Sequence, residues 1–302
     1  MTLIPAALDG ERVDRALCTL FGLARSQAAS MVTSGAVRVA GRPVSTRSRR
    51  VAEGDLLEVD LPAAVVESAL AADPGVAVPV VHADESVIVV DKPAGLVVHP
   101  SAGRPDGTLV HGLLALFPDL AAVGDPGRPG IVQRLDVGTS GLMVVARTPA
   151  AYESLVAQLA ARSVDRCYLA LVWGSFEVAA GAVDAPVGRA AGNRTSMAVS
   201  ARGRAARTGY RVVAQHHRPV DAALVECRLE TGRTHQVRVH MAAIGHPVVG
   251  DARYGGSRAP LRARRPLLHA SQLGFDHPGT GERCSFSSPP PADLEEVREL
   301  LE

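Results

Sequence analysis

Residues 131–146 read IVQRLDVGTSGLMVVA, and this stretch decides how the larger part of the chain is interpreted. An apolar pair leads in, the small residues 138–141 supply a tight turn, and the apolar run 142–146 predicts a strand. Asp136 therefore lies at a strand junction, where a carboxylate can serve as nucleophile or base. Aspartate also forms local hydrogen bonds in turns, and the segment taken alone favours that capping role.

Strand-like and helix-like patterns alternate on both sides of this segment, through residues 80–302. Helices are expected at 107–117 and at 149–161, the second with Pro149 in its first turn. Further strands are expected at 87–90, 167–173 and 222–229. Because many strands accompany few helices, the pattern predicts an α+β domain built on a mixed, mainly antiparallel β-sheet.

The N-terminal part of the chain predicts a small α/β domain of its own. Apolar residues recur at helical spacing through 13–21, and Ser26 is expected to cap a second helix that Gly35 ends. Short strands are expected around 36–39 and 55–59. Because the following residues are rich in Ala, Val and Pro without periodicity, they are interpreted as a linker. The expected organisation is a small domain at 1–62, a linker at 63–79 and a larger domain at 80–302.

Charge is concentrated in that small domain. Residues 12–50 hold eight Arg and one acidic residue, a net charge of +7, whereas the whole chain carries +1. A local basic segment on a near-neutral protein indicates a polyanionic partner. Taken alone, the same run of charge is explained equally well by a solvated face.

Cysteine usage and hydropathy limit the class of protein. The cysteines, at positions 18, 167, 227 and 284, are far apart and form no CxxC pair, so a zinc site is not expected. Four scattered cysteines without a secretory signal are typical of reduced thiols. No apolar run approaches the ~18 residues of a membrane span. The sequence therefore predicts a cytoplasmic protein without a membrane partner.

Residues 230–251 form a second polar cluster that contains Arg233, His235, Arg238, His240 and His246. Their spacing matches no HExxH-like ligand pattern, so a metal site is not favoured. If the segment is a strand, Gln236, Arg238 and His240 share one face. That arrangement would place large polar groups in a groove that meets substrate.

A third segment, residues 91–110, contains three glycines but lacks the spacing of a phosphate-binding P-loop. It begins with Asp91 and Lys92, and Lys92 is the only lysine of the chain. This lysine could anchor a phosphate or pair with an acidic residue, and the sequence leaves both alternatives open.

Six blocks in order resemble the RluA family of RNA pseudouridine synthases. They are DKPAGL at 91–96, QRLDVGTSGL at 133–142, RCYLA at 166–170, GRTHQVRVH at 232–240, HPVVGDARYG at 246–255 and LHA at 268–270. Residues 12–60 resemble an S4 RNA-binding domain through RVDRAL at 12–17 and ARSQAASMVTSGAVRVAGRPV at 24–44. An S4-like domain before such a catalytic domain is similar to the RluD-like branch, which acts on large-subunit ribosomal RNA.

The resemblance implies the pseudouridine synthase fold and a catalytic trio. Asp136 matches the family's catalytic aspartate, and Arg238 matches the basic residue that pairs with it. Tyr168 matches the tyrosine that contacts the target base and is implicated in proton transfer.

The resemblance also implies contacts with RNA. Arg134 matches an arginine that helps to hold the flipped-out nucleotide, and Val237 matches an aliphatic residue that packs near the uracil. His269 and Leu268 match a late block that supports or lines the site. The residues expected to bind RNA are Gln133, Arg134, Thr139, Arg233, His235, Val237 and Leu268 near the site, and Arg15, Arg25, Ser26, Arg42 and Arg47 in the S4-like domain.

The chain departs from the family pattern beside the aspartate. Gln133 stands where the family usually has a histidine associated with RNA binding and base flipping. Glutamine keeps a hydrogen-bonding side chain but cannot become cationic. Val137 and Gly138 replace the usual charged pair, which removes side-chain contacts beside the site.

Together these features predict an isomerase that converts specific uridines of 23S ribosomal RNA, free or in a precursor particle, to pseudouridine. No cofactor and no metal are expected, and the protein is expected to be a monomer. Two other classes stay open. A non-catalytic RNA-binding protein, such as a ribosome-assembly factor, would have no need of the intact trio. A hydrolytic N-glycosidase would use the same carboxylate with water.

Overall fold

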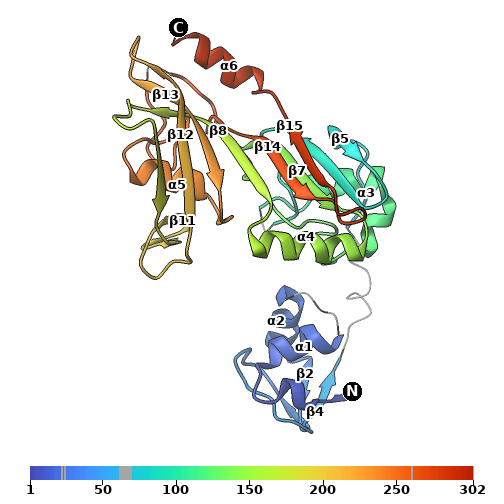
Figure 1. The fold of residues 1–302 in the computed structure, drawn as a ribbon. Coiled ribbons are helices and arrows are strands. Elements are labelled where there is room, and N and C mark those ends of the chain that lie inside the picture. Colours follow the sequence, from blue (N-terminus) through green and yellow to red (C-terminus); the bar gives the residue numbers. More distant parts are fainter. Residues whose placement is uncertain (22, 24, 61–69, 102, 260, 302) are drawn as a thin grey trace. The chain divides into compact units, whose positions relative to one another are not determined.

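The computed structural model describes residues 1–21, 23, 25–60, 70–101, 103–259 and 261–301. The chain divides into two compact units, one within residues 1–70 and one that holds almost all of 71–302 (Figure 1). Each unit has its own hydrophobic core. Part of the expected linker, residues 63–69, lies outside the described residues.

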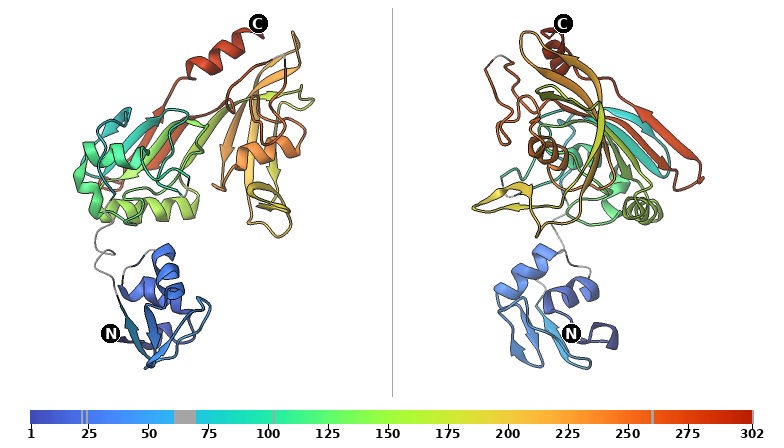
Figure 2. Two further views of the ribbon diagram at one scale, coloured as in Figure 1. Left: turned by 180° about the vertical axis from the view of Figure 1, so that it is seen from behind. Right: turned by 60° about the vertical axis from the view of Figure 1, so that its left-hand side comes forward.

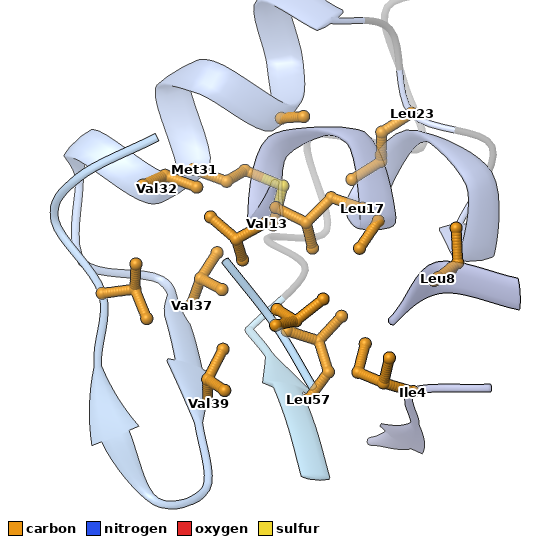
Figure 3. Packing of buried hydrophobic residues seen from close by; sticks show 14 residues of the cluster. Ile4, Leu8, Val13, Leu17, Leu23, Met31, Val32, Val37, Val39 and Leu57 are labelled. Carbon is orange, nitrogen blue, oxygen red and sulfur yellow. The ribbon is translucent and has the colours of Figure 1, made fainter. Parts of the chain in front are cut away.

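In the first unit, two helices pack on a small sheet with the strand order β1-β4-β2-β3. Val13 and Leu17 from the first helix and Met31 from the second meet Val37 and Leu57 of the sheet (Figure 3). The elements are β1 (Thr2–Leu3), η1 (Ala6–Leu8), α1 (Val13–Phe21), α2 (Arg25–Thr33), β2 (Val37–Val39), β3 (Arg42–Pro43) and β4 (Leu56–Val59). The small α/β unit expected from the sequence is present.

The prediction that Ser26 precedes and caps the second helix is wrong. Helix α2 begins at Arg25, so Ser26 lies in its first turn. Sequence patterns place helix ends only to within one or two residues, because the first turn has no internal hydrogen bonds to its N–H groups. The side chains of Arg25 and Ser26 lie outside the described part of the chain. Gly35 follows the helix with φ +80°.

The second unit is built on a nine-stranded sheet with the order β5-β6-β7-β14-β8-β13-β12-β9, and β15 pairs with β14. Among the described strands, β7 and β14 run parallel and every other neighbouring pair is antiparallel. This confirms the predicted α+β domain with a mixed, mainly antiparallel sheet. The strands are β5 (Val80–Ala83), β6 (Val87–Lys92), β7 (Ser140–Ala146), β8 (Asp165–Trp173), β9 (Ala180–Asp184), β12 (Arg207–His216), β13 (Ala222–Leu229), β14 (Leu268–Asp276) and β15 (Arg283–Ser287).

Helices cover the two halves of this sheet separately (Figures 1 and 2). Ala151 and Leu155 of α4 pack against β6, β7 and β14 and cover one face of β7, which is buried along its whole length. Leu294 of α6 packs against β8 and β13. The helices are α3 (Leu109–Leu116), η3 (Pro118–Ala122), α4 (Pro149–Ala161), α5 (Gln236–Ala243) and α6 (Ala292–Glu299), and a hairpin is formed by β10 (Val187–Ala190) and β11 (Asn193–Val199).

The strand interpretation of residues 236–240 is wrong, because these residues begin helix α5. Every residue from Gln236 to Met241 is buried, so no polar face marks a helical period. The Gln236 side chain accepts hydrogen bonds from the Arg233 N–H and the Thr231 hydroxyl, which closes the preceding turn. Tertiary contacts therefore override the strand-like alternation of Val237 and Val239.

Among the described helices, none combines the length and apolar character that crossing a membrane requires.

Candidate active site

Asp136 lies in a β-turn that ends directly before β7. The Thr139 N–H donates to the Asp136 carbonyl oxygen at 3.0 Å. The Asp136 side chain points away from this turn and accepts a hydrogen bond at Oδ2 from Nη1 of Arg238 at 2.9 Å. In the part of the chain that the structure describes, no hydrogen bond reaches Oδ1. The carboxylate is thus not a turn cap: one oxygen is held and the other is available.

Neighbouring segments hold this turn in place. The Gly95 N–H donates to the Val137 carbonyl at 2.6 Å, and Nη1 of Arg265 donates to the Gly138 carbonyl at 3.0 Å. Strand β14 runs so close behind the turn that a Cβ atom on Gly141, which has φ +114°, would lie 2.3 Å from the Ala270 carbonyl oxygen. Only glycine fits there. The geometry of Asp136 is therefore set by the sheet and by two loops.

Lys92 stabilises the loop that contacts the turn of Asp136. Its side chain is fully buried, and Nζ donates to the carbonyls of Pro93 at 2.8 Å and Leu96 at 2.9 Å. Burial, followed by the charge of Arg265, lowers the pKa of Lys92 to about 8. The hydrogen bonds of Nζ go to carbonyls of its own loop rather than to an acidic side chain.

Arg238, which lies on α5, donates hydrogen bonds to two carboxylates, those of Asp136 and Asp251. Its Nε and Nη2 donate to Oδ2 and Oδ1 of Asp251 at 2.6 and 2.9 Å, a bidentate pair, while Nη1 bonds Asp136. Arg238 is 7% exposed and Asp251 is 1% exposed. Burial opposes the charge, but the hydrogen bonds and charges of Asp251 and Asp136 outweigh it and raise the pKa of Arg238. Asp251 thereby fixes the arginine that holds Asp136.

His235 and Tyr254 complete the cluster around the carboxylate. Nε2 of His235 lies 3.8 Å from Oδ2 of Asp136, and Nδ1 lies 2.7 Å from the Tyr254 hydroxyl oxygen. The guanidinium of Arg238 lies over the Tyr254 ring at 5.0 Å. His240 and His246 lie elsewhere: their Nδ1 atoms contact the Thr208 hydroxyl and the Trp173 carbonyl.

A pocket opens beside Asp136. Residues that the sequence assigned separately line it together, namely Arg134, Thr139, Tyr168, Arg233, His235, Val237, Arg238 and Leu268. Leu229 and Val237 supply apolar surface and Tyr168 supplies an aromatic ring. Burial raises the pKa of Tyr168 to about 12, so its phenol is neutral near pH 7. The pocket thus places apolar and aromatic surface directly beside the carboxylate.

Replacing Tyr168 by Phe is expected to change the alkaline stability of the protein. An unfolded tyrosine ionises near pH ~10, whereas burial raises the native pKa to about 12. The unfolded chain releases this proton first, so the free energy of unfolding falls as the pH rises between the two values. In urea denaturation at stepped pH, Tyr168→Phe should lose less stability across that window than the wild type. Tyr210→Phe is the control, and equal slopes in all three proteins would contradict the assignment.

An arginine-lined groove continues from the pocket. Arg128, Arg134, Arg166, Arg204 and Arg233 line it, together with Gln133. Burial, and then the charges of Arg204, Arg162 and Arg166, lower the pKa of Arg233. Nε of Arg166 and Nε2 of Gln133 are buried without a hydrogen-bond partner among the described residues. Concentrated positive charge and unpaired donors make this groove suited to a polyanion.

The structure thus brings together Asp136, Tyr168 and Arg238 with all seven residues expected to bind RNA near the site. Asp251 and Tyr254 received no role from sequence reasoning, although the block HPVVGDARYG, which resembles the family pattern, contains both. Arg166, beside Tyr168 on β8, was missed in the same way. Their positions inside matched blocks were the available signal.

Three of the arginines expected to bind RNA in the first unit are exposed to solvent. Arg42 and Arg47 are exposed, and Arg15 is exposed while paired with Glu11 at 2.9 Å. Among the described residues, no group of three His, Cys, Asp or Glu side chains is arranged to hold a metal ion.

Comparison with known proteins places these features in context. A model of the RNA pseudouridylate synthase family matches residues 86–243, and an S4 domain model matches residues 11–57. The chain is 43% identical to an uncharacterized RNA pseudouridine synthase of Bacillus subtilis, over 96% of this chain and 94% of that protein. It is 44% identical to the ribosomal large subunit pseudouridine synthase D of Xanthomonas campestris, over 99% and 91%. A solved structure, human RNA pseudouridylate synthase domain containing 1, is similar with a TM-score of 0.59 and 28% identity, covering 74% of this chain and 90% of that one.

Proposed function

Because this chain belongs to the family of RNA pseudouridylate synthases, isomerases that convert uridine in RNA to pseudouridine, we propose that Asp136 carries the reaction on large-subunit ribosomal RNA. The observation that supports this most is the geometry of the carboxylate. Oδ2 is held by Arg238, while Oδ1 carries no hydrogen bond within the described structure and Asp136 lines a pocket with apolar and aromatic walls.

The reaction breaks the N1–C1′ bond of uridine, turns the base and joins C5 to C1′. C5 loses its proton to solvent and N1, freed from C1′, gains one from solvent, so the product has the same composition as the substrate. Oδ1 of Asp136 attacks C1′ or removes a sugar proton to give a glycal, and both routes use the same oxygen. Tyr168, neutral in its buried position, would contact the base and relay the C5 proton, giving its own phenolic proton to water as it takes the proton from C5.

The target base reaches this pocket only after leaving its stack, at a cost of a few kcal/mol. The groove that holds Gln133, Arg134 and Arg233 would bind the phosphates around the extruded nucleotide and offset that cost. Gln133 there offers an amide that reads hydrogen-bond donors and acceptors without adding charge.

The names of the relatives support large-subunit ribosomal RNA as the substrate. Proteins 41–44% identical over nearly the whole chain are named ribosomal large subunit pseudouridine synthase D. The S4 match supplies a second RNA-binding unit suited to such a large substrate. The protein would act as a monomer in the cytoplasm, on free ribosomal RNA or on a precursor particle.

The direct test combines purified protein, large-subunit ribosomal RNA labelled with tritium at C5 of uridine, and mapping of pseudouridine along the product. Tritium release with pseudouridine at specific sites is expected. An N-glycosidase would instead release free uracil and leave abasic sites. A non-catalytic binding protein would retain the label, and either outcome would refute the proposal.

Replacing both Arg42 and Arg47 by Gln is expected to weaken RNA binding without changing the rate at saturating RNA. These side chains are exposed and would neutralise phosphates, and each lost contact reduces the slope of log K against log salt concentration by about 0.7–0.9. Filter binding over a range of salt concentrations measures that slope. Arg218→Gln, an exposed arginine of the second unit, is the matched control. An unchanged slope in the double variant would remove the S4-like unit from RNA binding.

A further inference from the structure

His235 is held in an unusual backbone conformation directly before α5. Its φ is +58° and its ψ is 19°, in the left-handed region, which is uncommon outside glycine although asparagine, aspartate and histidine adopt it more often than other residues. The side chain is 16% exposed, and Nε2 lies 3.8 Å from Oδ2 of Asp136. A strained conformation at such a place is a reason to look for a role in the site.

The Tyr254 hydroxyl is the hydrogen-bond partner of one ring nitrogen of His235. The Met197 N–H donates to the Tyr254 oxygen at 2.9 Å, and Nδ1 of His235 lies 2.7 Å from the same oxygen. A phenol oxygen that accepts one hydrogen bond can donate its own hydrogen to an unprotonated Nδ1. The proton of the neutral ring then lies on Nε2, the nitrogen that faces the carboxylate.

The protonation state agrees with this arrangement. Burial lowers the pKa of His235; the charge of Asp136 opposes that shift, and the charges of Arg238 and Arg253 add to it. The ring is therefore neutral near pH 7 and offers a single N–H toward Asp136.

We propose that His235 is a positioning residue for the catalytic carboxylate: its Nε2–H, oriented by the Tyr254 hydroxyl, and Nη1 of Arg238 together hold Oδ2, and Oδ1 is thereby reserved for the substrate. The proposal rests on the proposed role of Asp136.

A second donor is needed because one hydrogen bond does not fix a carboxylate. The terminal torsion of aspartate is broad and nearly two-fold, so rotation about it exchanges the two oxygens. Arg238 places a single N–H on Oδ2, since its other two bonds go to Asp251. The 3.8 Å gap to Nε2 is longer than a hydrogen bond, and active-site contacts of this kind shorten when substrate binds.

The choice of variants at His235 separates positioning from backbone strain. Glutamine places an N–H close to the position of Nε2, whereas asparagine reaches only the position of Nδ1. Asparagine, however, tolerates the left-handed backbone better than glutamine does. Positioning therefore predicts that His235→Gln retains more activity than His235→Asn, and a purely structural role predicts the reverse order.

In single-turnover tritium release, His235→Asn should lose about 10²-fold in the rate of the chemical step, the effect of misplacing a reacting group by about 1 Å. His235→Gln should recover a large part of that loss. The KM for RNA should stay within about twofold of the wild-type value in both variants. A loss confined to KM would make His235 an RNA contact and overturn the proposal, as would equal or better activity of His235→Asn.

Tyr254→Phe tests the same proposal without touching His235. The variant keeps the ring beneath Arg238 but removes the hydroxyl, and we expect a loss of about tenfold in the chemical step, the effect of one hydrogen bond. Tyr210→Phe removes a phenolic hydroxyl away from the site and should match the wild type. A wild-type rate for Tyr254→Phe would overturn the proposal even if both His235 variants failed to fold. An inactive wild-type protein would instead refute the proposed function.

Discussion

Asp136→Asn is expected to reduce pseudouridine formation by about 10⁴-fold or more, the scale of loss on removing a catalytic nucleophile. The amide has nearly the same shape as the carboxylate, and its oxygen can still accept the hydrogen bond from Nη1 of Arg238. It can neither attack C1′ nor remove a sugar proton. The fold and the affinity for RNA should therefore persist while the chemistry is lost.

Tritium release from RNA labelled at C5 of uridine measures the rate, and filter binding at fixed salt measures the affinity. Asp106→Asn, at an exposed aspartate of the same unit, is the matched control and should retain full activity. Activity within tenfold of the wild type in Asp136→Asn would remove this carboxylate from the reaction. A parallel loss of RNA binding would assign it to substrate recognition instead.

The fold was predictable from sequence wherever local pattern and tertiary environment agree. The helix at 149–161 and the strand at 222–229 have the expected bounds, because the helix has proline in its first turn and the strand begins with an apolar run at 222–225. At 236–241 the two disagree. A fully buried helix offers no polar face, and the alternation of valine with polar residues resembles a strand.

The site was predictable to a different extent. Asp136 on its own indicated a turn cap, and only its resemblance to a family block suggested catalysis. Neither the local sequence pattern nor the family resemblance identified Asp251. This residue lies 13 positions after Arg238 in the sequence and pairs with it through two hydrogen bonds. Pairing of this kind depends on the path of the loop 244–251. Sequence periodicity does not predict the path of this loop, so the pairing of Arg238 with Asp251 is seen only in the structure.

The two ion pairs of Arg238 give it two roles, one in stability through Asp251 and one in activity through Asp136. Arg238→Met leaves Asp251, 1% exposed, without its cation, and breaking a buried pair in this way costs about 3–5 kcal/mol of unfolding free energy. The variant also releases Asp136 from its main hydrogen bond, so activity should fall by about 10²-fold or more.

The double variant Arg238→Met with Asp251→Asn should recover a large part of that stability, because the uncompensated charge at position 251 is gone. It should recover no activity, since Asp136 still lacks the hydrogen bond from Arg238 to Oδ2. Urea denaturation and single-turnover tritium release measure the two quantities on the same preparations, and Asp251→Asn alone completes the cycle. If activity returned together with stability, Arg238 would act only by supporting the fold. If neither returned, Asp251 would have a further role beyond holding Arg238. Recovery of stability alone is the expected outcome, because Arg238 is oriented by Asp251 through Nε and Nη2 and donates to Asp136 through Nη1.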